Sequence, residues 1–185
     1  QLSIQQKLKI EQAFANLNIG VAYSSISQFD TASVFLKTAV DLFQESDDKS
    51  KRALSLLEYG ANLQAKGLLD ESLENYEAAL SIAKNSNAQL LVSRIHQNIG
   101  NNYMYRSENQ TAQKHQELAL SIKRQLNNPD TAGLQMNLGM IATELGDYPR
   151  GLELYLNAIE AYTNKHDSAS VAMVHSNLGS LYRMM

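Results

Sequence analysis

Glycine recurs along this chain at a stride of 40, 40, 39 and 40 residues, at Gly20, Gly60, Gly100, Gly139 and Gly179. Each of these glycines lies in an apolar stretch with helical periodicity, where glycine costs about 1 kcal/mol relative to alanine. A close helix–helix contact that recurs at every position explains why the cost is repeated. The spacing therefore predicts an internal repeat built from tightly packed helix pairs, that is, an all-α solenoid.

Residue types at fixed offsets from each glycine support this interpretation. Apolar residues at offsets −1 and +3 fall mainly on one helical face. At offset +7 stand residues that form turns. Small residues stand at offset +12 and alanine at offset +19, and these small side chains let two helices approach closely. These three sets are Ser27, Gly67, Ser107 and Gly146; Ala32, Ser72, Ala112 and Gly151; and Ala39, Ala79, Ala119 and Ala158.

The links between repeats carry signals that end one helix and begin the next. Asn, Asp, Ser and Pro gather at residues 46–48, 85–87, 127–130 and 165–168, and such residues cap and interrupt helices. Near the start, Ser3 and Gln6 have the spacing of a capping box. We therefore expect nine helices, arranged as four hairpins and one unpaired helix.

The composition narrows the classes of function. The 185 residues carry a formal net charge of −3 and no cysteine, which argues against a nucleic-acid binder and excludes disulfides and thiolate catalysis. No apolar run has the length of a membrane span, and no catalytic, cofactor or metal-binding motif is present. We expect no enzymatic activity within this chain, no cofactor, no metal and no contact with membrane. The cytoplasm is favoured as its compartment, and the periplasm stays open.

The pattern resembles the tetratricopeptide repeat (TPR) family, most plainly in the fourth repeat. The residues that carry this resemblance are Leu138, Gly139, Gly146, Asp147, Tyr148, Gly151, Tyr155 and Ala158. The repeat in this chain is longer than the family's usual repeat of about 34 residues. In its length it resembles the repeats of kinesin light chain, Pins-type adaptors and bacterial TPR signalling proteins. The resemblance implies an all-α superhelical solenoid of antiparallel helix pairs, with about four and a half repeats.

On this interpretation, residues 1–185 form a single TPR array. We expect repeats at residues 13–46, 53–86, 93–126 and 132–165, and the first helix of a truncated fifth repeat at residues 172–185. We also expect the chain to be a fragment of a longer protein.

The resemblance further implies that the first helices of successive repeats line a concave groove, at offsets −6, −3, −2, +1, +4 and +5 from each glycine. Amide side chains there both donate and accept hydrogen bonds and suit a peptide backbone, whereas methionines adapt to varied partners. The alternative, that these side chains pack within the repeat, stays open. The candidate ligand contacts are Arg94, Gln97, Asn98, Asn101, Asn102, Met136, Asn137, Met140 and Asn177.

These features predict a non-catalytic scaffold that binds a protein or peptide segment. Of the positions with which chaperone-binding relatives grip a C-terminal carboxylate, only Arg94 and Asn98 match, which argues against that ligand. One alternative is the sensory or regulatory region of a bacterial diguanylate cyclase, histidine kinase or transcription regulator whose output domain lies outside this sequence. Another is self-association through the open ends of the solenoid.

Overall fold

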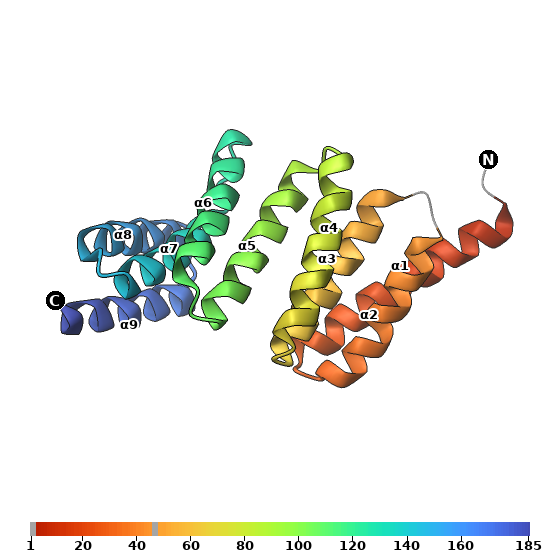
Figure 1. Cartoon of the computed structure of the whole chain (residues 1–185), viewed down its shortest axis with the longest axis horizontal. Helices are drawn as coiled ribbons and strands as arrows, with labels where there is room; N and C mark the ends of the chain where they lie inside the picture. The colour runs from red at the N-terminus through yellow and green to blue at the C-terminus, as the bar shows by residue number, and fades with distance from the viewer. Residues whose placement is uncertain (1–2, 46–47) are drawn as a thin grey trace. The chain divides into compact units, whose positions relative to one another are not determined.

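The computed structural model describes residues 3–45 and 48–185, and over these ranges the chain forms nine α-helices and no β-strand (Figure 1). The expectation of an all-α chain with nine helices is confirmed for this part of the chain. Residues 46 and 47 of the first predicted link lie outside the described residues. The helices are α1 (Ile4–Ser25), α2 (Phe29–Gln44), α3 (Lys49–Ala65), α4 (Leu69–Asn85), α5 (Gln89–Tyr105), α6 (Asn109–Gln125), α7 (Ala132–Glu144), α8 (Tyr148–Asn164) and α9 (Ser168–Met184).

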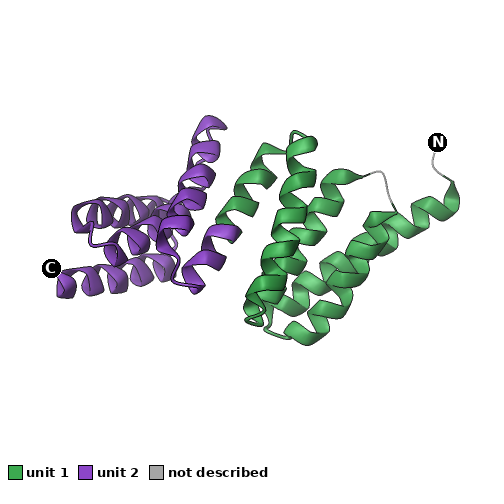
Figure 2. Ribbon diagram, viewed as in Figure 1, with its two compact units in different colours: residues 1–98 green, residues 99–185 purple. Residues whose placement is uncertain are grey.

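The helices group into two compact units, residues 1–98 and residues 99–185, and the division falls within α5 (Figure 2). In the first unit α1 packs on α2, α2 on α3 and α3 on α4. In the second unit α6 packs on α7, α7 on α8 and α8 on α9. Consecutive helices are therefore the packing partners within each unit, as expected for helix hairpins joined by short turns.

Four of the five register glycines lie where a second helix approaches too closely for any side chain. In each case the covering side chain belongs to the residue sixteen positions later in the sequence. A Cβ atom would lie 2.6 Å from the Leu36 side chain at Gly20, 2.7 Å from Tyr76 at Gly60, 2.8 Å from Gln116 at Gly100 and 2.7 Å from Tyr155 at Gly139. The predicted close contact is confirmed at these four glycines.

Gly179 differs from the other four, because nothing in the described chain lies within 4 Å of a Cβ atom built there. Gly179 belongs to α9, the last helix, and no later described helix covers it. The predicted close contact is therefore observed at four of the five glycines, and at Gly179 it stays a prediction.

The small residues and the turn residues occupy the places that the sequence pattern predicts. The four alanines at offset +19 are fully buried, and the four small residues at offset +12 are buried as well. At offset +7, Ser27, Gly67, Ser107 and Gly146 all have positive φ, between 59° and 80°, the left-handed conformation that commonly ends a helix. The capping box of Ser3 and Gln6 is also confirmed.

In the second unit, a charged cluster ties the link before α7 to the two neighbouring second helices. The Nζ atom of the buried Lys123 in α6 donates to the backbone oxygen of Asp130 at 2.6 Å and to its carboxylate at 3.3 Å. Lys165, which directly follows α8, donates to the other carboxylate oxygen of Asp130 at 2.6 Å. Asp130 therefore neutralises the buried charge of Lys123, and it connects α6 and the end of α8 to the link before α7.

The close contact at Gly139 predicts opposite effects for the same substitution at two register glycines. We expect Gly139→Ala to lower the free energy of unfolding by about 1–3 kcal/mol, because the new methyl group would overlap the buried Tyr155 ring. Gly179→Ala is the matched control and should raise it by up to about 1 kcal/mol, because helix propensity alone changes there. Urea unfolding of both variants measures the difference; equal effects would contradict the assignment of the contact.

The Asp130 cluster predicts a component of stability that depends on acidity. The hydrogen bond from Lys165 lowers the pKa of the Asp130 carboxyl below its ordinary value, opposed by burial and assisted by Lys123. Because the pKa is depressed in the folded state, this stabilisation is present above the unfolded pKa and is lost as the pH falls from about 4 through the folded value. Carboxyl-detected NMR titration should show the pKa of Asp130 rising in Lys165→Met. An identical titration curve in the variant would contradict the role given to Lys165.

Candidate functional site

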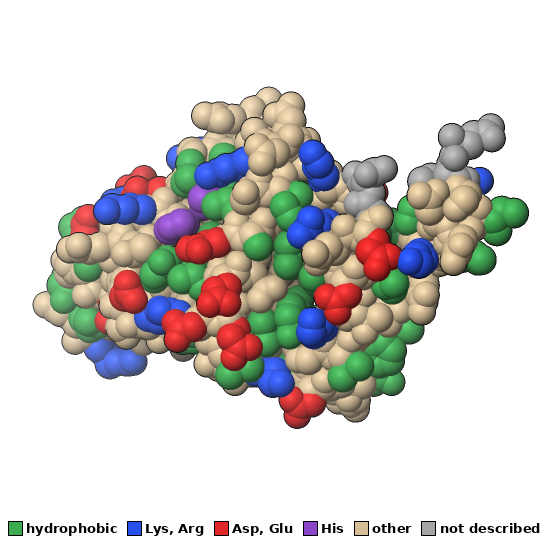
Figure 3. All heavy atoms as spheres, turned by 45° about the vertical axis from the view of Figure 1, so that its right-hand side comes forward, with side chains coloured by type: hydrophobic (Ala, Val, Ile, Leu, Met, Phe, Trp, Pro, Cys, Tyr) green, Lys and Arg blue, Asp and Glu red, His purple; other side chains and the backbone are tan. Residues whose placement is uncertain are grey.

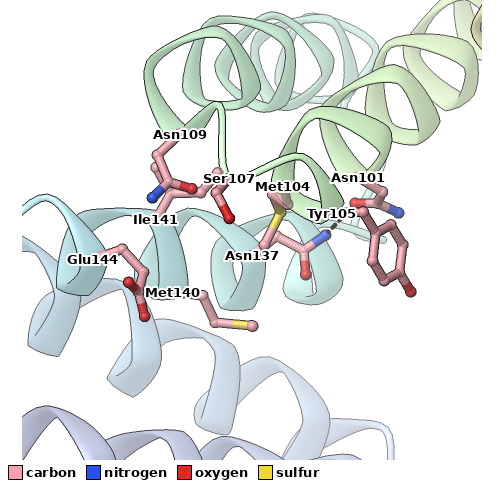
Figure 4. Close-up of a pocket in the computed structure, with 9 residues that line it drawn as sticks. All are labelled: Asn101, Met104, Tyr105, Ser107, Asn109, Asn137, Met140, Ile141 and Glu144. Carbon is pink, nitrogen blue, oxygen red and sulfur yellow. Dashed lines mark hydrogen bonds between the residues drawn. The ribbon is translucent and has the colours of Figure 1, made fainter. Parts of the chain in front are cut away.

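A hollow of about 500 Å³ opens in the second unit between the end of α5 and the second half of α7 (Figure 4). By the glycine register, these are the first helices of two neighbouring repeats. The turn before α6 and the first residue of α6 close one side. The lining residues are Asn101, Met104, Tyr105, Ser107, Asn109, Asn137, Met140, Ile141 and Glu144.

Two asparagine side chains from different helices meet in this hollow. Asn137 Nδ2 in α7 donates to Asn101 Oδ1 in α5 at 2.8 Å, the bond drawn in Figure 4. The same Asn101 oxygen accepts a second bond, of 2.7 Å, from Gln116 Nε2 in α6. Because its oxygen accepts two donors, the Asn101 amide has one defined orientation. Its nitrogen points away from Asn137 in Figure 4.

The remaining lining combines apolar side chains with a single charge. Tyr105 is 71% exposed and Met140 is 36% exposed, so both present apolar surface to a ligand. Glu144 is the only charged residue among the described residues that line the hollow, and it has no ion-pair partner in the described chain. The hollow is therefore suited to uncharged polar and apolar groups, and it offers no cation to bind a carboxylate.

Three of the residues predicted from the sequence, Asn101, Asn137 and Met140, come together in this hollow. Met136 instead packs against the core cluster that contains Tyr155 and Leu178. Asn177 is half-buried in α9.

The predicted residues on the earlier part of α5 belong to the first unit. Arg94 NH2 donates to Glu58 Oε1 in α3 at 2.7 Å, and Gln97 and Asn98 are half-buried. Asn102, which follows in the second unit, is fully buried, and its oxygen accepts from Arg106 Nε at 3.0 Å. This corrects the assignment of Asn102 to the ligand groove, because a fully buried side chain has no surface to offer.

Sequence reasoning did not single out several lining residues. Met104, Tyr105 and Glu144 occupy groove offsets +4 and +5, so the register alone could have named them. Ser107 comes from the turn and Asn109 is the first residue of α6, and the groove offsets cover neither position. Gln116 was also missed, although its offset of +16 is the position that covers the glycine in the other repeats.

A second hollow, of about 440 Å³, lies on α6, α7 and α8. Leu120, Leu138 and Leu154 form an apolar cluster at its base. Across its rim, Arg150 in α8 forms an ion pair with Glu117 in α6. This ion pair links two second helices, and its partners satisfy each other, so we assign the hollow a structural role.

On the face shown in Figure 3, acidic and basic side chains are interspersed, and neither kind forms a large patch. The described residues contain no group of three or more His, Cys, Asp or Glu side chains placed to hold a metal ion. Within the same residues, no helix combines the length and apolar character that crossing a membrane requires.

Comparison with known proteins supports the repeat assignment. A tetratricopeptide repeat family model matches residues 130–185, and a search of curated proteins finds no match. Among solved structures, the apo form of RapI aligns with 21% identity and a TM-score of 0.82, covering 89% of this chain and 61% of RapI. Aspartyl phosphate phosphatase F from Bacillus subtilis aligns with 15% identity and a TM-score of 0.83, over 90% of this chain and 44% of that protein.

A third solved structure is the Rap conjugation gene regulator of the plasmid pLS20 in complex with the Phr* peptide. It aligns with 22% identity and a TM-score of 0.78, over 85% of this chain and 44% of the regulator. This chain therefore spans between 44% and 61% of the length of these three proteins. At such identities the likeness concerns the fold, which for this chain is an all-α TPR solenoid. The chain is thus an all-α helical-repeat protein in which residues 130–185 match the tetratricopeptide repeat family, and its fold is similar to solved structures over most of its length.

Proposed function

We propose that this chain is a non-catalytic scaffold that binds a peptide or protein segment on the surface formed by the end of α5 and by α7 in its second unit. The observation that carries the proposal is the pair of amides, Asn101 and Asn137, inside a hollow of about 500 Å³ that also exposes methionine and tyrosine. The pair supplies hydrogen bonds without charge, and the apolar side chains supply contact area.

The geometry suggests how a peptide backbone is held. The Asn101 oxygen is occupied by two donors, whereas the Asn101 nitrogen and the Asn137 oxygen make no hydrogen bond within the described residues. A peptide bond presents one acceptor and one donor. A ligand carbonyl can therefore accept from Asn101 Nδ2, and a ligand N–H can donate to Asn137 Oδ1.

The side chains of the ligand would meet a mainly apolar wall. Met104 and Met140 are flexible and polarisable, which suits side chains of varied shape. Tyr105 adds a rigid aromatic surface with a polar end, a type of residue that is common at binding hot spots. Apolar ligand side chains would thus contribute affinity, and the amides would fix the position of the backbone.

The comparisons favour a peptide as the class of ligand. One structural neighbour, the pLS20 conjugation regulator, is solved with a peptide bound. Another neighbour is named as a phosphatase, and that activity is said of that protein alone. The regulatory role in a larger bacterial protein, the self-association, the repeat boundaries and the contacts from Arg94, Gln97, Asn98 and Asn177 stay predictions.

Selection from a random peptide display library, with the full chain as bait, tests the proposal. We expect the recovered peptides to bind Asn101→Ala and Asn137→Ala at least about fivefold more weakly, the loss expected for one hydrogen bond of about 1 kcal/mol. Asn157→Ala, which changes an exposed asparagine at the second hollow, is the matched control and should bind normally. Equal binding by all three variants would refute a site at the amide pair.

The single charge in the hollow makes a further prediction about the ligand's terminus. Because Glu144 is the one charged side chain that the described residues contribute to the lining, recovered peptides should bind at least as tightly with an amidated C-terminus as with a carboxylate. Glu144→Lys should shift the preference toward the carboxylate by up to about fivefold, since exposed charge pairs contribute up to about 1 kcal/mol. Fluorescence anisotropy with both peptide forms measures this. A requirement for the carboxylate in the unmodified chain would contradict the prediction.

A further inference from the structure

One repeat departs from the others at the residue that covers its glycine. This residue is apolar or aromatic in three repeats but is glutamine in the third, and each of the four is buried. The four residues are Leu36, Tyr76, Gln116 and Tyr155. An apolar side chain fills this position in the first repeat, so packing alone does not require an amide at Gln116. A buried amide must be hydrogen-bonded to avoid a substantial desolvation cost.

The Gln116 side chain connects the core of its helix pair to the candidate site. It covers Gly100 in α5 with zero exposed fraction. Its Nε2 atom then donates to the oxygen of Asn101, one residue beyond that glycine, at 2.7 Å. The bond therefore passes from the interior of the pair to a side chain that lines the hollow.

We infer that Gln116 is a positioning residue, which fixes the Asn101 amide so that its nitrogen faces the ligand. An asparagine amide has nearly the same shape after a rotation of 180°, so packing alone selects its orientation weakly. Gln116 and Asn137 both present N–H donors to one side of Asn101. With Gln116 and Asn137 in their observed orientations, a rotated Asn101 amide would set its own donors against theirs and would lose both bonds. The observed orientation keeps the two bonds and leaves the Asn101 donor toward the ligand.

The inference rests on the proposed function, because it specifies how that site distinguishes a ligand carbonyl from a ligand N–H. With Gln116 in place, Asn101 offers a donor and Asn137 offers an acceptor. Without it, Asn101 keeps only the bond from Asn137 and can rotate more readily. Pre-organisation of this kind lowers the entropic cost of binding.

The test compares Gln116→Met with the unmodified full chain. Methionine has a similar length and fills the space over Gly100, but it cannot donate to Asn101. Gln113→Met is the matched control on the same helix, because Gln113 bonds to Glu117 and not to the hollow. We expect both variants to stay folded, as measured by thermal unfolding.

The first readout is the ¹H–¹⁵N spectrum of side-chain amides in the ligand-free protein, which a purely packing role would leave unchanged. The Asn101 amide signal should shift, and its proton exchange should accelerate, in Gln116→Met and not in Gln113→Met. The second readout is affinity for the peptides selected above. We expect a loss of about threefold to tenfold in Gln116→Met, the range for one hydrogen bond in a partly buried site.

The outcomes separate the inference from the function on which it rests. Unchanged Asn101 signals and unchanged affinity in folded Gln116→Met would overturn the inference, while peptides that still require Asn137 would leave the proposed function intact. Peptides that bind independently of both asparagines would defeat the proposed function itself. If Gln116→Met unfolds, Gln116→Leu repeats the test with the residue that stands at this position in the first repeat. Unfolding of both variants would assign Gln116 to folding and would overturn the inference.

Discussion

The close approach of two helices at four of the repeat glycines sets the geometry of the helix pairs. In four repeats, one large side chain of the second helix lies against the backbone of the first helix, where no Cβ atom stands in the way. Buried alanines at offset +19 extend the same contact. The residue directly after the glycine is at least partly exposed in each of the four repeats, as Val21, Ala61, Asn101 and Met140. The glycine contact thus marks the side of the first helix that the second helix covers.

In the third repeat the same contact also carries chemistry. Gln116 covers Gly100 as an apolar residue would, and it also donates to Asn101 in the hollow. The covering residue of the second repeat, Tyr76, likewise donates to a first-helix amide, that of Gln64. In the third repeat the covering residue is itself an amide, and it orients a side chain of the hollow. Hydrogen bonds within a buried polar network help to specify one arrangement of its side chains, and the bonds that Gln116 Nε2 and Asn137 Nδ2 donate to Asn101 are of this kind.

Much of the fold could be predicted from the sequence, because the same pattern of residue types recurs in each repeat. The close contacts at the glycines, the burial of the alanines and the positions of the turns were each predictable from spacing and residue type. The site was predictable only in part. Register named Asn101, Asn137 and Met140 as candidate groove residues, and the structure brings them together in one hollow, but register also included Asn102, which is buried. An offset along a helix specifies the side of that helix on which a residue lies. It does not specify whether a neighbouring helix covers the side chain. The hydrogen bonds among the three amides could not be predicted, since they depend on distances across three helices.

The central claim is that a ligand binds at the amide pair and not elsewhere on the second unit. The most direct test maps the chemical-shift changes of the full chain, in both backbone and side-chain signals, as a selected peptide is added. The account predicts that the largest changes fall on the side-chain amides of Asn101 and Asn137 and on the methyl groups of Met104 and Met140. Changes concentrated instead on Leu120 and Leu154, in the second hollow, would contradict it.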